Sequence, residues 1–190
     1  MPIIIGAKQE SGFDDPIGLL GDCHRRIERF LSALLLVADQ ARGGPLNNDQ
    51  RTALEKSLRY FCESAPKHTA DEEESLFPRL NNGGSEWADT LASITELEQE
   101  HVQATIYHQA VDGLGRRWLA DDHLAASDFE RLLIALTALD LLYRRHIKVE
   151  ESVVFPLAAR VLSQTQKASI GTEMASRRGI QQKEQRNGNH

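Results

Sequence analysis

The sequence predicts an all-α protein, an up-down-up-down four-helix bundle followed by a short C-terminal helix. Two observations carry this prediction. Glycine and proline gather in a few clusters that separate long segments, and within these segments apolar residues recur every three or four positions, the period of an amphipathic helix. Four such segments of about 25–30 residues, joined by short connections, are typical of an antiparallel bundle.

The first two helices are predicted from their start and stop signals. The first should begin at Asp14-Asp15-Pro16, where an acidic N-cap precedes proline at the first helical position, and should end at Gly43. The second should start near Asn48, and Pro66 should kink or split it.

The third and fourth helices follow the same logic. The third should span about residues 85–112, and the fourth should open at Ser127 with the capping box Ser127-x-x-Glu130. The dipeptides Phe77-Pro78 and Phe155-Pro156 are interpreted as helix terminators with an aromatic plug. A short fifth helix is expected over about residues 163–178.

The chain is expected to form one main domain. Residues 1–13 form an N-terminal extension, residues 14–162 form the bundle, and residues 163–190 form the short helix and a disordered polar tail. The length of 190 residues and the hydrophobic fraction of 41% suit a globular protein with a sizeable core.

Charge and composition restrict the class of protein further. The net charge of −6 argues against nucleic-acid binding, and no apolar run approaches the ~18 residues of a membrane span. Met1–Gly6 does not resemble a signal peptide, and only Cys23 and Cys62 are present, which suits a reducing compartment. We expect a cytoplasmic protein that binds neither nucleic acid nor membrane. The oligomeric state, including a homodimer, and the role of the basic tail stay open.

Six polar residues occupy positions on the helical stripes that should be apolar, and together they lie on all four helices. A buried polar group without a partner costs a few kcal/mol, so six of them need a common partner. A set of hydrogen-bonded core residues is the alternative, and we disfavour it. The six are His24, His68, Glu72, His101, His146 and Glu150.

The order of these residues repeats along the chain. Residues 68–78 and 146–156 both read H-x3-E-E-x3-F-P. A lone His precedes each copy at nearly the same distance, 44 residues from His24 to His68 and 45 residues from His101 to His146. The chain therefore consists of two helix pairs, each of which supplies one His and then a His and a Glu at i and i+4.

This spacing suits a metal site. Residues at i and i+4 lie on one helix face with their Cβ atoms about 5–6 Å apart, so each His–Glu pair can reach one cluster. Four His and two Glu fit two metals, each with two nitrogens, joined by two bridging carboxylates and an oxo or hydroxo group. Imidazole and carboxylate ligands without thiolate favour iron, with manganese or zinc less favoured.

The doubled motif resembles the hemerythrin-like HHE cation-binding family over about residues 14–162. The resemblance implies a four-helix bundle around a non-haem di-iron centre. By motif position, the implied ligands are His24 from the first helix, His68 and Glu72 from the second, His101 from the third, and His146 and Glu150 from the fourth.

The sequence departs from the oxygen-carrying members at two positions. Those proteins have a second His one turn after the third-helix ligand, where this chain has Thr105, and a His…Asp pair where it has His146 and Glu150. The chain is thus similar to the symmetric two-Glu branch, which includes bacterial proteins linked to iron-centre repair and nitric oxide response.

The resemblance implies a protein that binds metal and a small ligand (O₂, NO or peroxide) in oxygen, NO or iron sensing or in stress defence. It is expected to be a binding protein more than a turnover enzyme, and no catalytic residue is assigned. The alternative is a di-iron enzyme or an iron donor for the repair of iron–sulfur centres.

Residues near the six are expected to have lesser roles. Glu73, Glu74 and Glu151 should face solvent, with a hydrogen bond from a ligand His to Glu73 or Glu151 as the alternative. His108 lies two turns from His101, about 10 Å along the axis, so a core or supporting role is expected rather than ligation. Other expectations are solvated side chains for His123 and His190, buried thiols for Cys23 and Cys62, and packing roles for Tyr107 and Tyr143.

Overall fold

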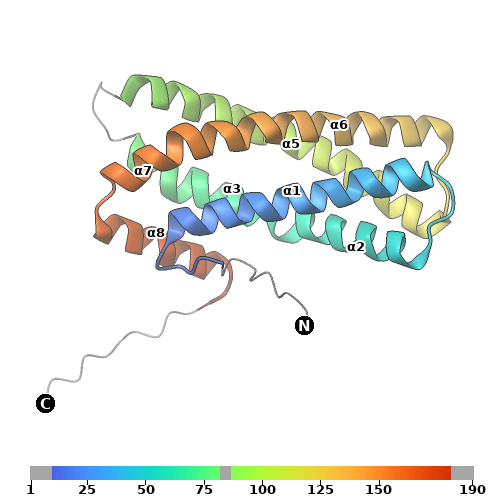
Figure 1. The fold of residues 1–190 in the computed structure, drawn as a ribbon, viewed down its shortest axis with the longest axis horizontal. Helices are drawn as coiled ribbons and strands as arrows, with labels where there is room; N and C mark the ends of the chain where they lie inside the picture. Colours follow the sequence, from blue (N-terminus) through green and yellow to red (C-terminus); the bar gives the residue numbers. More distant parts are fainter. Residues whose placement is uncertain (1–9, 82–86, 181–190) are drawn as a thin grey trace, which may run out of the picture.

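The bundle fold predicted from the periodicity is confirmed. A computed structural model describes residues 10–81 and 87–180, and this part of the chain is all-α. Four long helical segments lie side by side and alternate in direction (Figure 1). They are α1 (Pro16–Ala41), α2 (Asn48–Glu63) continued by α3 (Ala65–Asp71), α5 (Ala88–Asp121) and α6 (Ala126–Val149).

Shorter elements complete the architecture. The second segment continues through a π-helix, η1 (Glu72–Leu76), into α4 (Phe77–Leu80). The fourth continues through a second π-helix, η3 (Glu150–Val154), into α7 (Phe155–Val161). The predicted C-terminal helix is present as α8 (Gln164–Arg177). The expected tail disorder falls on residues 181–190, which lie outside the described residues.

The first two segments begin and break where the sequence predicts. Asp15 is the N-cap of α1, and its carboxylate accepts a hydrogen bond from the Gly18 N–H at 3.1 Å. Asn47 caps α2 in a capping box with Gln50. Proline at position 66 separates α2 from α3, since it lies in the first turn of α3, where a missing N–H leaves no hydrogen bond unmade.

The third helix runs beyond its predicted end. Gly113 and Gly115 lie inside α5, which continues to Asp121. Gly115 serves close packing, because a Cβ atom at this position would lie 2.8 Å from Cδ1 of Leu58 on α2. The predicted start near Ser85 falls outside the described residues.

The capping box predicted at Ser127 is wrong. Helix α6 begins one residue earlier, at Ala126, with Ala125 as its N-cap and no side-chain cap. Contacts with the opposite loop fix this start: Asp122 adopts a left-handed conformation with φ 54°, and the Leu124 N–H donates to the Gly43 carbonyl at 2.8 Å.

The two Phe-Pro dipeptides do not end their helices, which corrects the sequence interpretation. In each copy the chain widens to a π-helix and remains helical past the proline. The Phe77 N–H donates to the Glu72 carbonyl, and the Phe155 N–H donates to the Glu150 carbonyl, five residues back in both cases. The wider turn accommodates a proline that lacks an N–H and would clash in a regular helix. Each π-helix begins at one of the predicted glutamate ligands.

Two apolar cores fill the bundle, one on either side of the six predicted ligands. The first core surrounds Ile27, Leu58 and Trp118, whose Nε1–H donates to the Gly44 carbonyl at 2.8 Å. The second core surrounds Leu20 and Phe77. The polar residues are therefore held between two close-packed layers, which restricts both their movement and the entry of water.

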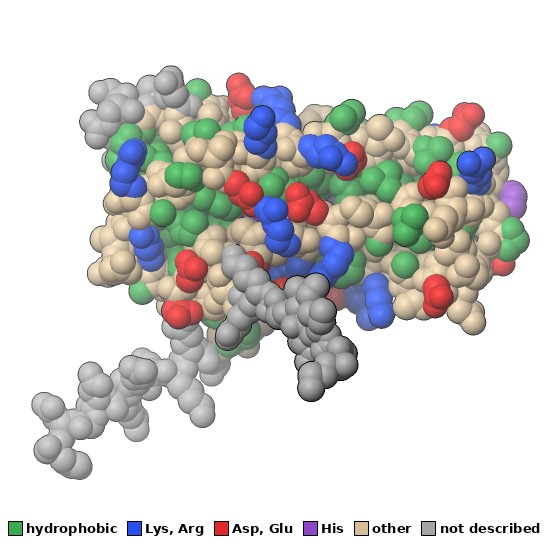
Figure 2. All heavy atoms as spheres, in the orientation of Figure 1, with side chains coloured by type: hydrophobic (Ala, Val, Ile, Leu, Met, Phe, Trp, Pro, Cys, Tyr) green, Lys and Arg blue, Asp and Glu red, His purple; other side chains and the backbone are tan. Residues whose placement is uncertain are grey.

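Helix α8 covers one side of the bundle next to α1, α3 and η1 (Figure 1). Arg79 joins it to the bundle through an ion pair with Glu173 at 2.6 Å. Acidic and basic side chains are interspersed over the face shown in Figure 2. Within the described residues, none of the helices has the length and apolarity that crossing a membrane requires.

Candidate metal centre

The structure brings the six predicted ligands together in the interior. His24 comes from α1, His68 from α3, His101 from α5 and His146 from α6, while Glu72 and Glu150 begin the two π-helices. None of the six is more than 7% exposed, and both glutamates are fully buried. Sequence positions far apart in the chain thus form one polar cluster.

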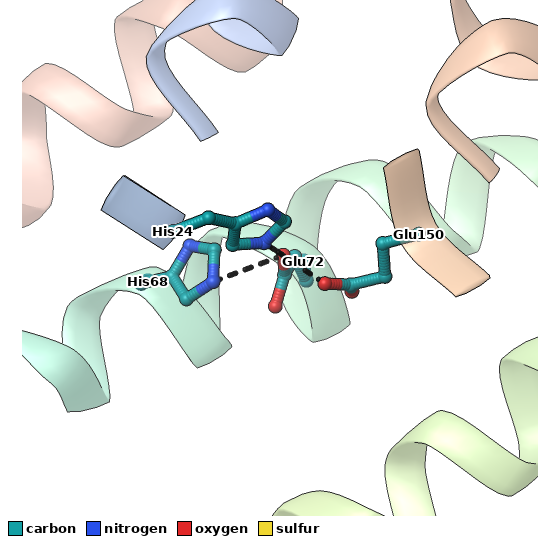
Figure 3. Close-up of side chains that lie close together, drawn as sticks. All are labelled: His24, His68, Glu72 and Glu150. Atoms are coloured by element: carbon teal, nitrogen blue, oxygen red, sulfur yellow. Dashed lines mark ion pairs between the residues drawn. The ribbon is translucent and has the colours of Figure 1, made fainter. Parts of the chain in front are cut away.

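The cluster divides into two groups of four that share both glutamates. In each group one potential ligand atom from every residue lies within 4.8 Å of the others. The first group contains His24 and His68, and the second contains His101 and His146. Figure 3 shows the first group, in which both imidazoles point toward the two facing carboxylates. Two shared carboxylates and two imidazoles on each side match the binuclear arrangement expected from the repeat.

Each glutamate contacts one His from each half of the chain. Glu72 lies 3.3 Å from His68 Nε2 and 3.5 Å from His101 Nε2. Glu150 lies 3.0 Å from His24 Nε2 and 3.4 Å from His146 Nε2. Both carboxylates therefore span the two halves.

The carboxylate oxygens are buried without hydrogen bonds. Among the described residues, neither oxygen of Glu72 nor either oxygen of Glu150 has a hydrogen-bond partner, and the same holds for His24 Nε2. Leaving such groups unsatisfied costs roughly 1–3 kcal/mol each, and more when they are charged. A pair of cations at this position would satisfy all of them, so the donor set fits a binuclear metal site.

The protonation of the cluster also suits metal binding. Burial lowers the pKa of His68 well below its ordinary value, and burial together with the neighbouring His146 lowers the pKa of His101. These imidazoles are therefore neutral donors. Burial and the adjacent Glu150 carboxylate raise the pKa of Glu72 well above its usual range. The pKa of Glu150 is lowered, because contacts with His24 and His146 outweigh its burial.

Three further glutamates orient the imidazoles from outside the cluster. Each accepts a hydrogen bond from the Nδ1–H of one imidazole, which leaves Nε2 directed at the shared carboxylates. The pairs are His24 with Glu151 at 3.0 Å, His101 with Glu73 at 2.8 Å and His146 with Glu100 at 2.9 Å.

These contacts revise the expectations for the neighbouring acids. Glu73 and Glu151 take the alternative role, a hydrogen bond to a predicted ligand, instead of facing solvent alone. Glu74 is 66% exposed, as expected, and pairs with Arg177. The sequence reasoning missed Glu100. The sequence signal for Glu100 is its position directly before His101, but the imidazole that it contacts, His146, lies on another helix.

His68 differs from the other three imidazoles. Its Nδ1 is buried and has no hydrogen-bond partner among the described residues. The residue that corresponds to Glu100 in the first half is Cys23, one position before His24. Cys23 is buried, as expected, and burial raises the pKa of its thiol. Cys62 is exposed, which corrects the expectation that both thiols are buried.

Other singled-out residues lie outside the cluster. His108 pairs through Nε2 with the Tyr143 hydroxyl at 2.8 Å, which confirms that it belongs to neither group of four. Thr105 is exposed and donates to the His101 carbonyl at 2.9 Å. His123 is exposed, and His190 falls outside the described residues.

A buried cluster of four imidazoles and two shared carboxylates inside a four-helix bundle defines a class of cation-binding bundle proteins. The chain belongs to the hemerythrin HHE cation-binding domain family, whose model matches residues 15–158. An uncharacterized protein of Haemophilus influenzae is similar as well: it is 28% identical over 188 residues, which cover 94% of this chain and 99% of that protein.

Proposed function

We propose that this chain holds two iron ions and uses them to bind a small ligand, O₂, NO or peroxide, in sensing or in stress defence. The observation that carries the proposal is the set of four buried carboxylate oxygens, none of which forms a hydrogen bond with the described residues, between two pairs of imidazoles. Burying such a set is costly unless its charge is neutralised, and a cation held by the facing imidazoles would do so.

The donor types support iron over the other candidates. The cluster offers nitrogen and carboxylate oxygen, and neither group of four contains a thiolate. This combination suits iron first and manganese next, whereas structural zinc sites usually contain cysteine. Bound iron would supply redox chemistry and affinity for diatomic ligands and peroxide.

The protein's own residues keep the donors in place and exclude water. Phe155 stacks on the His24 ring at 5.2 Å with an interplanar angle of 11°, and Phe77 is parallel to the His101 ring at 6.4 Å. The Phe-Pro dipeptides thus place an aromatic ring against one imidazole of each group. The Nδ1 contacts fix the orientations of three of the four imidazoles, and a phenylalanine ring packs against two of these three.

Metal analysis of the purified full-length chain tests the proposal. We expect about two irons per chain, one for each group of four potential ligands, and a visible absorption that changes between air and argon. His68→Ala and His146→Ala should each lower the iron content, whereas the exposed control His123→Ala should leave it unchanged. One zinc, or no metal in cells supplied with iron, would contradict the di-iron proposal, as would full iron content in both ligand variants.

A second candidate, the release of iron to damaged iron–sulfur centres, is favoured by the environment of His68. Because its Nδ1 lacks a carboxylate partner, the metal on that side should be held less firmly than the metal on the other. Transfer of iron to an apo iron–sulfur protein would support this role. Consumption of NO or peroxide by substoichiometric amounts of the chain would instead indicate turnover.

A further inference from the structure

A pocket of about 340 Å³ lies beside the metal centre, between α2, α3 and α5. Leu58, Phe61 and Ala104 contribute apolar walls, and His101 lines the pocket where it meets the cluster. The proposed small ligands do not require this volume. For comparison, an apolar cavity of about 150 Å³ is enough to hold benzene.

The repeat shows that this space is specific to one side of the molecule. Ala104 and His108 follow His101 by three and seven residues, and the residues that follow His24 by the same distances are Ile27 and Leu31. Ile27 and Leu31 are 1% and 3% exposed and fill the first core.

The facing helix shows the same contrast. Ala65 lines the pocket three residues before His68, whereas the larger Tyr143 stands three residues before His146. Ala65 and Ala104 therefore keep the pocket open, each at a position where its counterpart in the repeat has a larger side chain.

The charges around the pocket disfavour ions. Among the described residues, those that line it include neither Lys nor Arg. Asp112 is already paired with Arg116 at 2.8 Å. Burial lowers the pKa of His108 to about 4, so its imidazole is neutral near pH 7. An anion would find no compensating charge, and the paired Asp112 offers little attraction to a cation.

The aromatic lining indicates the shape of the ligand. The rings of Phe61 and His108 are stacked at 4.6 Å with an interplanar angle of 27°, and the Tyr143 hydroxyl holds His108 in this orientation. Flat aromatic faces of this kind pack well against another ring, stacked or edge-on.

From these observations we infer that the pocket binds an uncharged aromatic molecule of one or two fused rings against His101, the side of the pocket that faces the cluster. Its walls come from protein side chains alone, so this binding does not depend on the identity of the metal. The inference therefore goes beyond the proposed function and can fail independently of it.

Calorimetric titration of the metal-loaded full chain with indole tests the inference, with indole-3-carboxylate as the charged counterpart. Indole should bind, and the carboxylate should bind at least about tenfold more weakly. Ala104→Ile, which introduces the residue that the other half carries, should fill the pocket and weaken indole binding at least about tenfold. Ala120→Ile, at an exposed position of the same helix, is the matched control.

The outcomes separate the two proposals. Loss of indole binding in Ala104→Ile, with metal content and helical circular dichroism unchanged, would support the inference. No binding of indole to the parent chain, equal binding of both probes, or undiminished binding to Ala104→Ile would overturn it. If Ala104→Ile fails to fold, Thr105→Trp at the exposed rim replaces it and should obstruct the pocket in the same way. Metal content reports separately on the di-iron proposal.

Discussion

The two halves of the chain supply the same donors but surround them differently. Each half contributes a lone His, a His–Glu pair at i and i+4, and a π-helix that begins at the glutamate. The glutamate that follows each shared carboxylate crosses to the other half, Glu73 to His101 and Glu151 to His24. The symmetry therefore includes the donors and two of the hydrogen bonds that the imidazoles make to glutamates outside the cluster.

The symmetry does not extend to the third hydrogen bond between an outer glutamate and an imidazole. It also does not extend to the residue that precedes each shared glutamate. Glu100 orients His146, whereas Cys23 stands at the corresponding position in the first half. Before Glu72 stands the fully buried Asp71, and before Glu150 stands Val149.

Among residues 10–81 and 87–180, ion pairs of this kind with α8 are formed by the first half alone. Asp71 forms ion pairs with two arginines at the end of α8, Arg177 at 2.9 Å and Arg178 at 2.7 Å. A repeat can thus keep the donors symmetric while the residues around them make the two metal positions inequivalent.

The largest expected effect is that of Asp71→Val, which gives the first half the residue of the second. The substitution leaves Arg178 without its carboxylate and Arg177 with the exposed Glu74 alone, and breaking a buried pair in this way costs about 3–5 kcal/mol. Urea unfolding of the full chain should show a loss of this size. The free energy of unfolding is the quantity to compare.

The matched control for this change is Glu173→Gln. It removes a different ion pair between α8 and the bundle, the pair with Arg79, which is more exposed and should contribute about 0–1 kcal/mol. Equal losses in the two variants would show that the buried pairs of Asp71 contribute no more to stability than the more exposed pair of Glu173.

The next effect concerns the inequivalence of the two metal positions. In the parent chain, a chelator should remove the metal on the His68 side first, because only that side has an imidazole without an outer carboxylate. Glu100→Gln should weaken the metal on the His146 side about tenfold, the low end of the usual range, because the amide oxygen still accepts the hydrogen bond. The two phases of release should then move closer together.

Glu96→Gln is the control for this measurement. Glu96 lies on the same helix and, like Glu100, pairs with Arg145, but it is 64% exposed and lies outside the cluster. Release in a single phase from the parent chain would argue against inequivalent positions. An identical response in the two glutamine variants would assign the effect to Arg145.

The cluster was predictable because its signal is local and repeated. The pairs His68–Glu72 and His146–Glu150 follow helical spacing, and the lone His24 and His101 keep the same distance before each pair. Polar residues on stripes that are otherwise apolar require a shared partner, and this requirement selected all six residues without knowledge of the helix packing.

Other features depend on contacts between helices and could not be predicted in this way. Glu100 lies next to His101 in sequence but orients His146 on the neighbouring helix. Gly115 has the signature of a helix break, yet it serves the close approach of Leu58. The π-helices change the local period itself, so a search at the regular helical period misplaces Glu73.

The smallest effect we predict separates His108 from its counterpart Leu31. Burial lowers the pKa of His108 from 6.5 to about 4, so the unfolded chain binds more protons than the folded chain between these values. The contribution of His108 to the free energy of unfolding is therefore fully present above pH 6.5 and is lost as the pH falls toward 4. Between pH 7 and 5.5 the free energy of unfolding should fall by about 1 kcal/mol because of this group.

His108→Leu should remove this part of the pH dependence, even though it leaves the Tyr143 hydroxyl without its partner and lowers the stability at pH 7. The test is the slope of unfolding free energy against pH in metal-free protein, compared between variant and parent. Parallel slopes would show that His108 titrates alike in the folded and unfolded chain, and the contrast with Leu31 would then be one of shape alone.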